Sequence, residues 1–236
     1  MSSTEISREA PVLRGFFDSI AGRYDFLNHL LSFRLDESWR RRSRNLLLEG
    51  GRGAGAVLDL GTGTGKFLRL FWEVGLGRER LVGLDFSPGM LERARREIPA
   101  EADLVQADFQ ALPFQDEYFD LVISAFALRS VRDMPGFLSN VRRMLRKGGR
   151  AALLCLTRPQ SRLWNALYFP YLRFYLPAVG GAVSGNRRAY EFLSGSILTF
   201  QDPEQTASMM AEAGFSDAAV HRFSWGAATL ILGCKA

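Results

Sequence analysis

Apolar and polar residues alternate with two different periods along this chain. Over the first 48 residues, apolar positions recur every three or four residues, which is the period of an amphipathic helix. The pattern predicts a helix over 12–32 and a second over 37–48, and glycines at 50, 51, 53 and 55 then break the chain. From residue 56, apolar runs of strand length alternate with helical stretches. That alternation is typical of βαβ units and a parallel sheet covered on both faces.

The second pattern predicts the elements of one α/β domain. Strands are expected at 56–60, 81–84, 104–107, 119–126 and 150–156, and helices at 66–74, 88–97 and 134–146. A helix at 203–213 and a hairpin of strands at 218–223 and 227–234 close the chain. We therefore expect a doubly wound, mostly parallel, seven-stranded sheet. Its expected parts are a helical cap (1–50), a core (56–156), an insert (157–200) and a C-terminal helix with a hairpin (201–236).

The insert is the most apolar part of the chain. Residues 163–185 contain one charged side chain, Arg173, and are rich in Trp, Tyr and Phe. The length would suffice for a membrane-spanning helix. Prolines at 170 and 177 and glycines at 180 and 181 disfavour one. We expect an apolar lid or substrate wall, and the alternative is a pair of core helices that bind no ligand.

A glycine-rich turn follows the first predicted strand. Gly61, Gly63 and Gly65 allow the backbone to turn tightly and to approach a ligand without a Cβ in the way. A nicotinamide or flavin site would need a further glycine at position 66, where Lys66 stands. The turn therefore predicts a nucleotide-like ligand other than a dinucleotide.

Acidic residues stand at the ends of the first three predicted strands. Asp59 would repel a pyrophosphate but can receive a cationic amino group, and Asp85 can accept the ribose hydroxyls of a nucleoside. A nucleoside without phosphates that carries a cation describes S-adenosylmethionine (SAM). Asp108 can accept the adenine amino group while the Phe109 backbone contacts a ring nitrogen; alternatively, Asp108 is an ordinary turn or N-cap residue.

Several blocks of the sequence resemble known methyltransferases. The segment 58–65, Asp85, Asp108 and the segment 112–120 resemble class I SAM-dependent methyltransferases in general. The segments 17–28 (FDSIAGRYDFLN) and 126–131 (FALRSV), with 190–197, resemble more specifically the ubiquinone/menaquinone biosynthesis C-methyltransferases. This resemblance spans about residues 14–235.

The resemblance implies a SAM-dependent C-methyltransferase that acts on a polyprenylated quinol, converting demethylmenaquinol to menaquinol. The implied cofactor-binding residues are Asp59, Gly61, Thr64, Gly65, Asp85, Asp108, Phe109 and Ala125. Arg129 is the implied catalytic residue and acts through water at the reacting ring. Because arginine stays charged, it is a poor base, but it can lower the pKa of the quinol and hold the developing oxyanion. The alternative for Arg129 is an exposed arginine at the start of a helix.

Other residues of the resembling segments bear on the cofactor and the substrate, and some depart from the family. Tyr24 and Asp25 are expected to close over the methionine end of the cofactor, with helix packing and a surface carboxylate as the alternatives. Five residues replace the Ser, Gly, Asn, Glu and Tyr of the family; in that order they are Ala125, Ala127, Ser130, Cys155 and Phe192. These changes leave open another small lipophilic substrate, or a catalytically silent SAM-binding component of a quinone-biosynthesis complex.

The net charge of the chain indicates which classes of partner it can bind. The net charge of +5 suits an anionic membrane surface, nucleic acid or acidic ligands. The Asn/Asp-Pro-Pro-aromatic motif of nucleic-acid methyltransferases is absent after the fourth strand, so we expect no nucleic-acid partner. Arginines at 158, 162, 187 and 188 flank the apolar segment 163–185 of the insert. They favour a cytoplasmic protein that contacts the inner face of the membrane peripherally, and a homodimer is left open. The two cysteines lie in apolar runs, so we expect buried thiols and no disulfide. The sequence shows no spacing typical of metal ligands. The polar segment 1–11 lacks the apolar core of a signal peptide.

Overall fold

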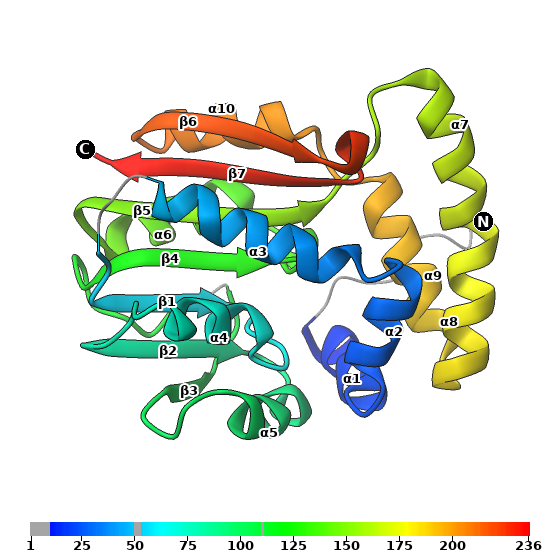
Figure 1. Cartoon of the computed structure of the whole chain (residues 1–236), viewed down its shortest axis with the longest axis horizontal. Helices are drawn as coiled ribbons and strands as arrows, with labels where there is room; N and C mark the ends of the chain where they lie inside the picture. The colour runs from blue at the N-terminus through cyan, green and yellow to red at the C-terminus, as the bar shows by residue number, and fades with distance from the viewer. Residues whose placement is uncertain (1–9, 50–52, 110) are drawn as a thin grey trace.

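The computed structural model describes residues 10–49, 53–109 and 111–236, so the prediction for segment 1–11 lies almost entirely outside it. Its centre is a seven-stranded sheet of order β3-β2-β1-β4-β5-β7-β6 (Figure 1). The strands are β1 (Ala56–Leu60), β2 (Arg80–Asp85), β3 (Asp103–Gln106), β4 (Phe119–Ala125), β5 (Leu145–Leu156), β6 (Phe215–Phe223) and β7 (Ala228–Lys235). Strands β1 to β5 pair in parallel, and β7 runs antiparallel to both of its neighbours. The predicted fold class is confirmed.

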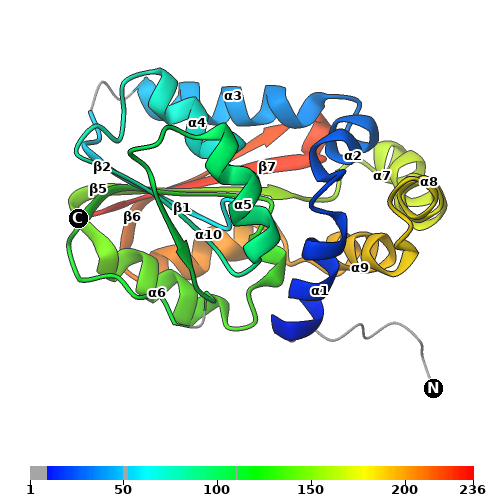
Figure 2. The ribbon, with the colours of Figure 1, turned by 90° about the horizontal axis from the view of Figure 1, so that it is seen from below.

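Helices cover both faces of this sheet (Figure 2). On one face lie α3 (Leu35–Leu48) and α4 (Lys66–Glu73), whose Trp39, Phe67 and Phe71 share an apolar cluster with β1. On the other face lie α6 (Met134–Met144) and α10 (Pro203–Glu212), and α5 (Pro88–Glu97) connects β2 to β3. Because β1 is covered on both sides, all five of its residues are buried.

The predicted elements differ most from the structure at two places. The helix expected over 12–32 is two helices, α1 (Ala10–Ile20) and α2 (Tyr24–Leu31). Gly22 lies in the turn between them, where Arg23 N donates to Ile20 O, and glycine destabilises a helix interior. Strand β5 begins at Leu145 rather than near residue 150. Its first residues include Lys147 and two glycines and carry no apolar run, so their pattern resembled a helix end followed by a loop.

The insert forms a helical layer at the carboxyl end of the parallel strands. It contains α7 (Arg162–Pro170), a π-helical turn η2 (Tyr171–Tyr175), α8 (Leu176–Ser184) and α9 (Arg187–Leu198). These helices bury an apolar cluster against α1 and α2 that includes Leu27, Leu31, Leu172, Leu176 and Tyr190. The cap and the insert therefore pack together beside the sheet (Figure 1). Among the described residues, no helix is both long enough and apolar enough to cross a bilayer.

Candidate active site

The glycine-rich turn lies at the topological switch point of the sheet. The chain passes from β1 to β2 on one side and later returns to place β4 on the other side of β1, and open α/β sheets bind ligands at such a point. Gly61, Gly63 and Gly65 have φ angles of +73°, +55° and +83°, which favour glycine. A Cβ on Gly61 would lie 2.5 Å from the Cβ of Ala127, whereas the space beside Gly63 is open. The backbone at Gly63 can therefore meet a ligand.

Two buried carboxylates flank the turn. Asp85 accepts hydrogen bonds from Gly63 N and Ser87 N, both at 2.9 Å, and burial raises its pKa to about 6. Asp59 accepts a hydrogen bond from Thr62 Oγ1 at 2.9 Å through its Oδ2. Its buried Oδ1 has no hydrogen-bond partner among the described residues, and burial raises the pKa of this carboxyl to about 7. A cationic group beside Asp59 would supply the missing partner, so the site fits the ammonium of SAM.

The remaining predicted cofactor residues lie at neighbouring strand ends. Asp108 and Phe109 follow β3, and Ala125 ends β4. Phe109 is buried, and its ring tip would lie 3.1 Å from a Cβ on Gly61, so it packs beneath the turn. The structure thus brings the predicted set to one edge of the sheet. Direct contact between each residue and the nucleoside stays a prediction.

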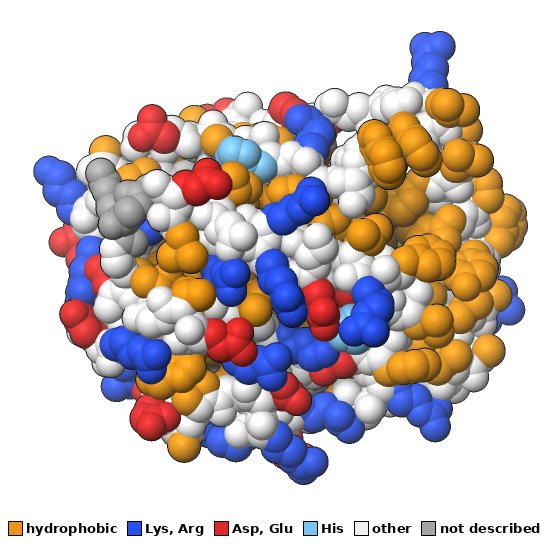
Figure 3. Space-filling view, viewed as in Figure 1, with side chains coloured by type: hydrophobic (Ala, Val, Ile, Leu, Met, Phe, Trp, Pro, Cys, Tyr) orange, Lys and Arg blue, Asp and Glu red, His pale blue; other side chains and the backbone are white. Residues whose placement is uncertain are grey.

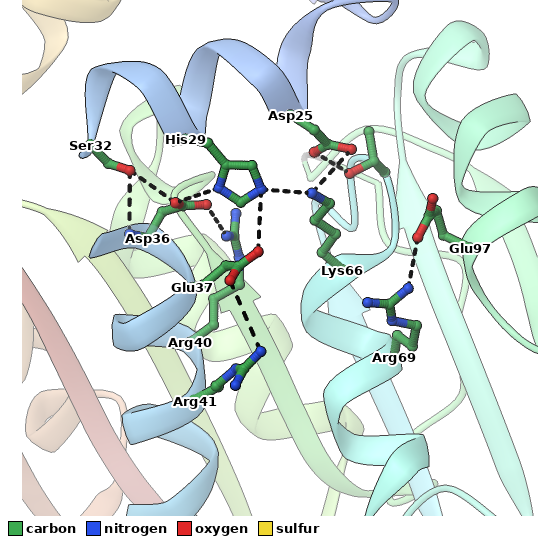
Figure 4. Close-up of polar contacts among 11 residues, drawn as sticks. Asp25, His29, Ser32, Asp36, Glu37, Arg40, Arg41, Lys66, Arg69 and Glu97 are labelled. Carbon is green, nitrogen blue, oxygen red and sulfur yellow. Dashed lines mark hydrogen bonds and ion pairs between the residues drawn. The ribbon is translucent and has the colours of Figure 1, made fainter. Parts of the chain in front are cut away.

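A chain of polar contacts ties the cap to the turn (Figure 4). Thr64 Oγ1 donates to Asp25 Oδ1 at 2.8 Å, and the Lys66 ammonium lies 3.5 Å from Asp25 Oδ2 and 3.1 Å from His29 Nε2. His29 Nδ1 lies 3.0 Å from Asp36 Oδ1, and the other oxygen of Asp36 accepts from Arg40 Nη1 at 2.6 Å. Burial opposes ionisation of Asp36, but Arg40 and the hydrogen bonds outweigh it and lower its pKa.

An apolar cavity of about 430 Å³ opens beside this network. The cap, the insert, the end of β4 and the β6–β7 turn all contribute to its wall. Its lining includes Phe16, Phe17, Ile20, Tyr24, Asn28, Leu31, Phe33, Asp36, Trp39, Phe126, Arg129, Ser130, Trp164, Leu167, Tyr168, Tyr171, Tyr190, Phe192, Leu193 and Trp225. The insert therefore forms part of the wall of this cavity as well as a packing layer.

Arg129 lies in the wall of this cavity. It belongs to a short 3₁₀ turn, η1 (Leu128–Ser130), directly after β4. Its Nη1 donates to Ser196 Oγ at 2.5 Å and its Nη2 to Phe126 O at 3.1 Å. The side chain is buried, which excludes the exposed-arginine alternative. Burial raises the pKa of the Cys155 thiol and of the Tyr168 hydroxyl to about 12, and the nearby Arg129 charge moderates both shifts.

Three of the five departures from the family lie at the cavity or the turn. Ser130 and Phe192 line the cavity, the Ala127 methyl closes over Gly61, and Cys155 is fully buried. The sequence did not indicate Ser196 or Trp225 as site residues. Ser196 is 67 positions from Arg129 in the sequence, and a local sequence pattern does not predict a contact between residues so far apart in the chain.

Comparison with known proteins is consistent with this geometry. The model of the ubiE/COQ5 methyltransferase family matches residues 4–235. The chain belongs to this family. It is 43% identical over 203 residues to a demethylmenaquinone methyltransferase of Thermus thermophilus, covering 85% of this chain and 91% of that protein. It is 38% identical over 230 residues to a ubiquinone/menaquinone biosynthesis C-methyltransferase, UbiE, of Geobacter sulfurreducens, covering 94% and 88% of the two chains.

A solved structure supports the same fold. A SAM-dependent methyltransferase of Thermotoga maritima, described as a possible histamine N-methyltransferase, superposes with a TM-score of 0.68. It is 20% identical and covers 95% of this chain and 100% of its own, so the likeness shows the fold alone. Family membership confirms the expected enzyme class and cofactor: this member of the ubiE/COQ5 family is a SAM-dependent methyltransferase.

Proposed function

We propose that this enzyme methylates a ring carbon of a polyprenylated quinol and converts demethylmenaquinol to menaquinol. The observation that carries the proposal is the apolar cavity, which has Arg129 in its wall. Another wall residue, Tyr24, is next in sequence to Asp25, which bonds to Thr64 of the turn expected to hold SAM. A fused aromatic ring with an isoprenoid tail suits such a lining, because apolar and aromatic side chains can bury the ring and the tail without removing many polar groups from water. The names of the relatives from Thermus and Geobacter support the same substrate class.

The residues of the chain orient and activate the quinol. SAM, when bound, supplies an electrophilic methyl group on a sulfonium. In the transfer, a ring carbon would gain the methyl group, the carbon–sulfur bond would break to leave the thioether S-adenosylhomocysteine, and the proton of the ring carbon would pass to water. Arg129, fixed by Ser196 and by the carbonyl of Phe126, stabilises the quinolate oxygen that makes the ring carbon nucleophilic. The apolar wall lowers the local dielectric constant and so strengthens that interaction.

The test is an assay of the purified enzyme with SAM and reduced demethylmenaquinone. We expect menaquinol by mass spectrometry, together with one S-adenosylhomocysteine per methyl group transferred. Turnover of other small lipophilic acceptors but not of demethylmenaquinol would favour the broader methyltransferase alternative. SAM binding without turnover on any acceptor would indicate a catalytically silent component.

A quinol with an isoprenoid tail must reach the cavity across an apolar surface of the protein. Hydrophobic side chains gather at the end of the molecule formed by α7 and α8, while charged side chains are scattered over the rest of the visible face (Figure 3). Phe33, Phe174 and Trp225 are 69%, 69% and 68% exposed. Trp225 stacks on Trp164 at 4.4 Å, so the β6–β7 turn and α7 present one aromatic edge. Exposed apolar patches of this kind mark interaction sites.

We propose that this edge contacts the inner face of an anionic bilayer peripherally, in the cytoplasm, and receives the quinol there. Aromatic side chains suit the interface between headgroups and acyl chains, and the exposed Arg158, Arg162, Arg187 and Arg188 can meet anionic headgroups. We expect the protein to sediment with anionic liposomes at low salt and less at high salt.

A matched pair of variants tests this surface. Trp164→Asp should reduce liposome binding and turnover on long-tailed quinols more than turnover on a tail-less analogue. Val74→Asp, at an exposed apolar residue away from the insert, should change neither. An equal loss of turnover on both substrates would mean that this edge only lines the cavity and does not contact the membrane. A dimer in sedimentation that Trp164→Asp dissociates would assign the edge to a second copy of the chain.

A further inference from the structure

Lys66 is a cation set directly beside the glycine-rich turn. It is the first residue of α4, and its side chain and that of Asp25 are 22% and 29% exposed. Its ammonium points to the cap, toward Asp25 and His29, whereas Arg69 on the same helix points to Glu97 (Figure 4). Arg69 and Glu97 form an outer ion pair with an Nη1–Oε2 distance of 2.8 Å. The two cations of α4 therefore have different surroundings.

The strand order fixes which end of the cofactor faces Lys66. Adenine is expected at the end of β3, beside Asp108, and ribose at the end of β2, beside Asp85. The rest of the molecule then extends over the ends of β1 and β4, past Asp59 and Thr64. That part of SAM is an amino acid, with an ammonium and a carboxylate. Asp59, with its unpartnered buried oxygen, suits the ammonium, so the carboxylate still needs a cation.

The contacts of Lys66 leave one of its N–H groups able to bind the carboxylate of SAM. His29 Nδ1 lies 3.0 Å from Asp36 Oδ1, and His29 Nε2 lies 3.1 Å from the Lys66 ammonium and 3.3 Å from Glu37 Oε1. Asp25 lies on a second side of the ammonium. A lysine ammonium has three donors, so one N–H remains for a further oxygen. Arg40, another cation of the network, is bonded to Asp36 and lies over the Phe126 ring at 4.9 Å.

We propose that Lys66, held by Asp25 and His29, binds the carboxylate of the methionine end of SAM. The proposal rests on SAM as the cofactor and not on the identity of the quinol. It gives α2 a part in cofactor binding, because Asp25 and His29 both belong to that helix.

The test is calorimetric binding of three ligands that need no methyl acceptor. S-adenosylhomocysteine carries the whole amino-acid end, its decarboxylated analogue keeps only the ammonium, and 5′-methylthioadenosine has neither charge. For Lys66→Gln we expect about tenfold or more weaker binding of S-adenosylhomocysteine, as for a hydrogen bond between charged groups. Binding of the two ligands without a carboxylate should stay within about twofold.

Two further variants control the experiment. Lys66→Arg keeps a cation and should retain most of the affinity for S-adenosylhomocysteine. Arg69→Gln removes a cation from the same helix and should leave all three affinities unchanged.

Two outcomes overturn the proposal. If Lys66→Gln weakens all three ligands equally, Lys66 supports the shape of the turn; if it weakens none, Lys66 only ties α2 to α4. Neither result bears on the proposed quinol, which depends on turnover with demethylmenaquinol.

Discussion

The buried carboxyl of Asp59 should make cofactor affinity depend on pH. Burial raises its pKa from 3.8 to about 7, and one of its oxygens lacks a hydrogen-bond partner among the described residues. A bound ammonium favours the ionised carboxylate, so below pH 7 the carboxyl must release a proton when the ligand binds. We expect affinity for S-adenosylhomocysteine to fall as the pH drops through 7, and Asp59→Asn to abolish this part of the dependence.

The size of the effect follows from the titration. For a pKa of about 7, roughly three quarters of the carboxyl is ionised at pH 7.5 and about one tenth at pH 6, a change of about eightfold in affinity. Asp85, whose pKa is about 6, adds a smaller change that Asp59→Asn retains. The α-amino group of the ligand, with an ordinary pKa of about 7.7–8.0, titrates alike in both proteins. The difference between the two proteins therefore reports Asp59 together with its charge coupling to Asp85.

Calorimetry in two buffers of different ionisation enthalpy counts the released protons. The wild type should release nearly one more proton per ligand at pH 6 than Asp59→Asn does. Stability gives a second check on the same group. Because the pKa is raised in the folded state, the stability that this carboxyl contributes is complete below its unfolded pKa and is lost as the pH rises through 7. Without ligand, Asp59→Asn should therefore melt at or above the wild type at pH 8. Equal pH slopes for both proteins would refute the reasoning.

Three other substitutions test the site and the turn. Asp85→Ala should cost about 1.5–3 kcal/mol of SAM affinity in calorimetry, since a charged hydrogen-bond acceptor is lost; unchanged affinity in a folded variant would remove Asp85 from the site. Arg129→Lys keeps the charge but loses the planar fork, so turnover should fall about a hundredfold with little change in SAM affinity; equal activity would make Arg129 structural. Gly65→Ala should destabilise the fold by about 1–3 kcal/mol in thermal melting, because φ is +83° and the new Cβ would lie 2.6 Å from Ile98 Cγ2. Gly195→Ala, where nothing lies within 4 Å, is the control and should not destabilise; equal melting temperatures for the two variants would contradict this account.

Most of the fold was predictable because its signals are local. Strands such as β1 and β4 are continuous apolar runs, since parallel strands are buried on both faces. The errors arose where the local signal is weak or ambiguous. Gly22 breaks a stretch whose apolar spacing continues on both sides of it. The glycines at 148 and 149 lie inside β5, where its pairing with β4 shifts register.

The cofactor side of the site was also predictable, for a topological reason. Asp59 and Asp85 each end a parallel strand, and the carboxyl ends of such strands meet at one edge of the sheet. The substrate side is different. Ser196 meets Arg129, and Trp225 meets Trp164, only because the insert folds back on the core. Such contacts depend on how separate layers dock, and no periodicity in the sequence encodes them.

Helix α2 joins the two sides of the site. Its neighbouring residues Tyr24 and Asp25 point in different directions, because successive residues of a helix are about 100° apart. Tyr24 lines the apolar cavity, while Asp25 bonds to Thr64 in the glycine-rich turn. The helix is held by Leu27 and Leu31, which are buried against the insert. A shift of the insert would therefore move the cavity wall and the cap contacts of the turn together, so the position of the quinol and that of the methyl donor depend on the same packed helix.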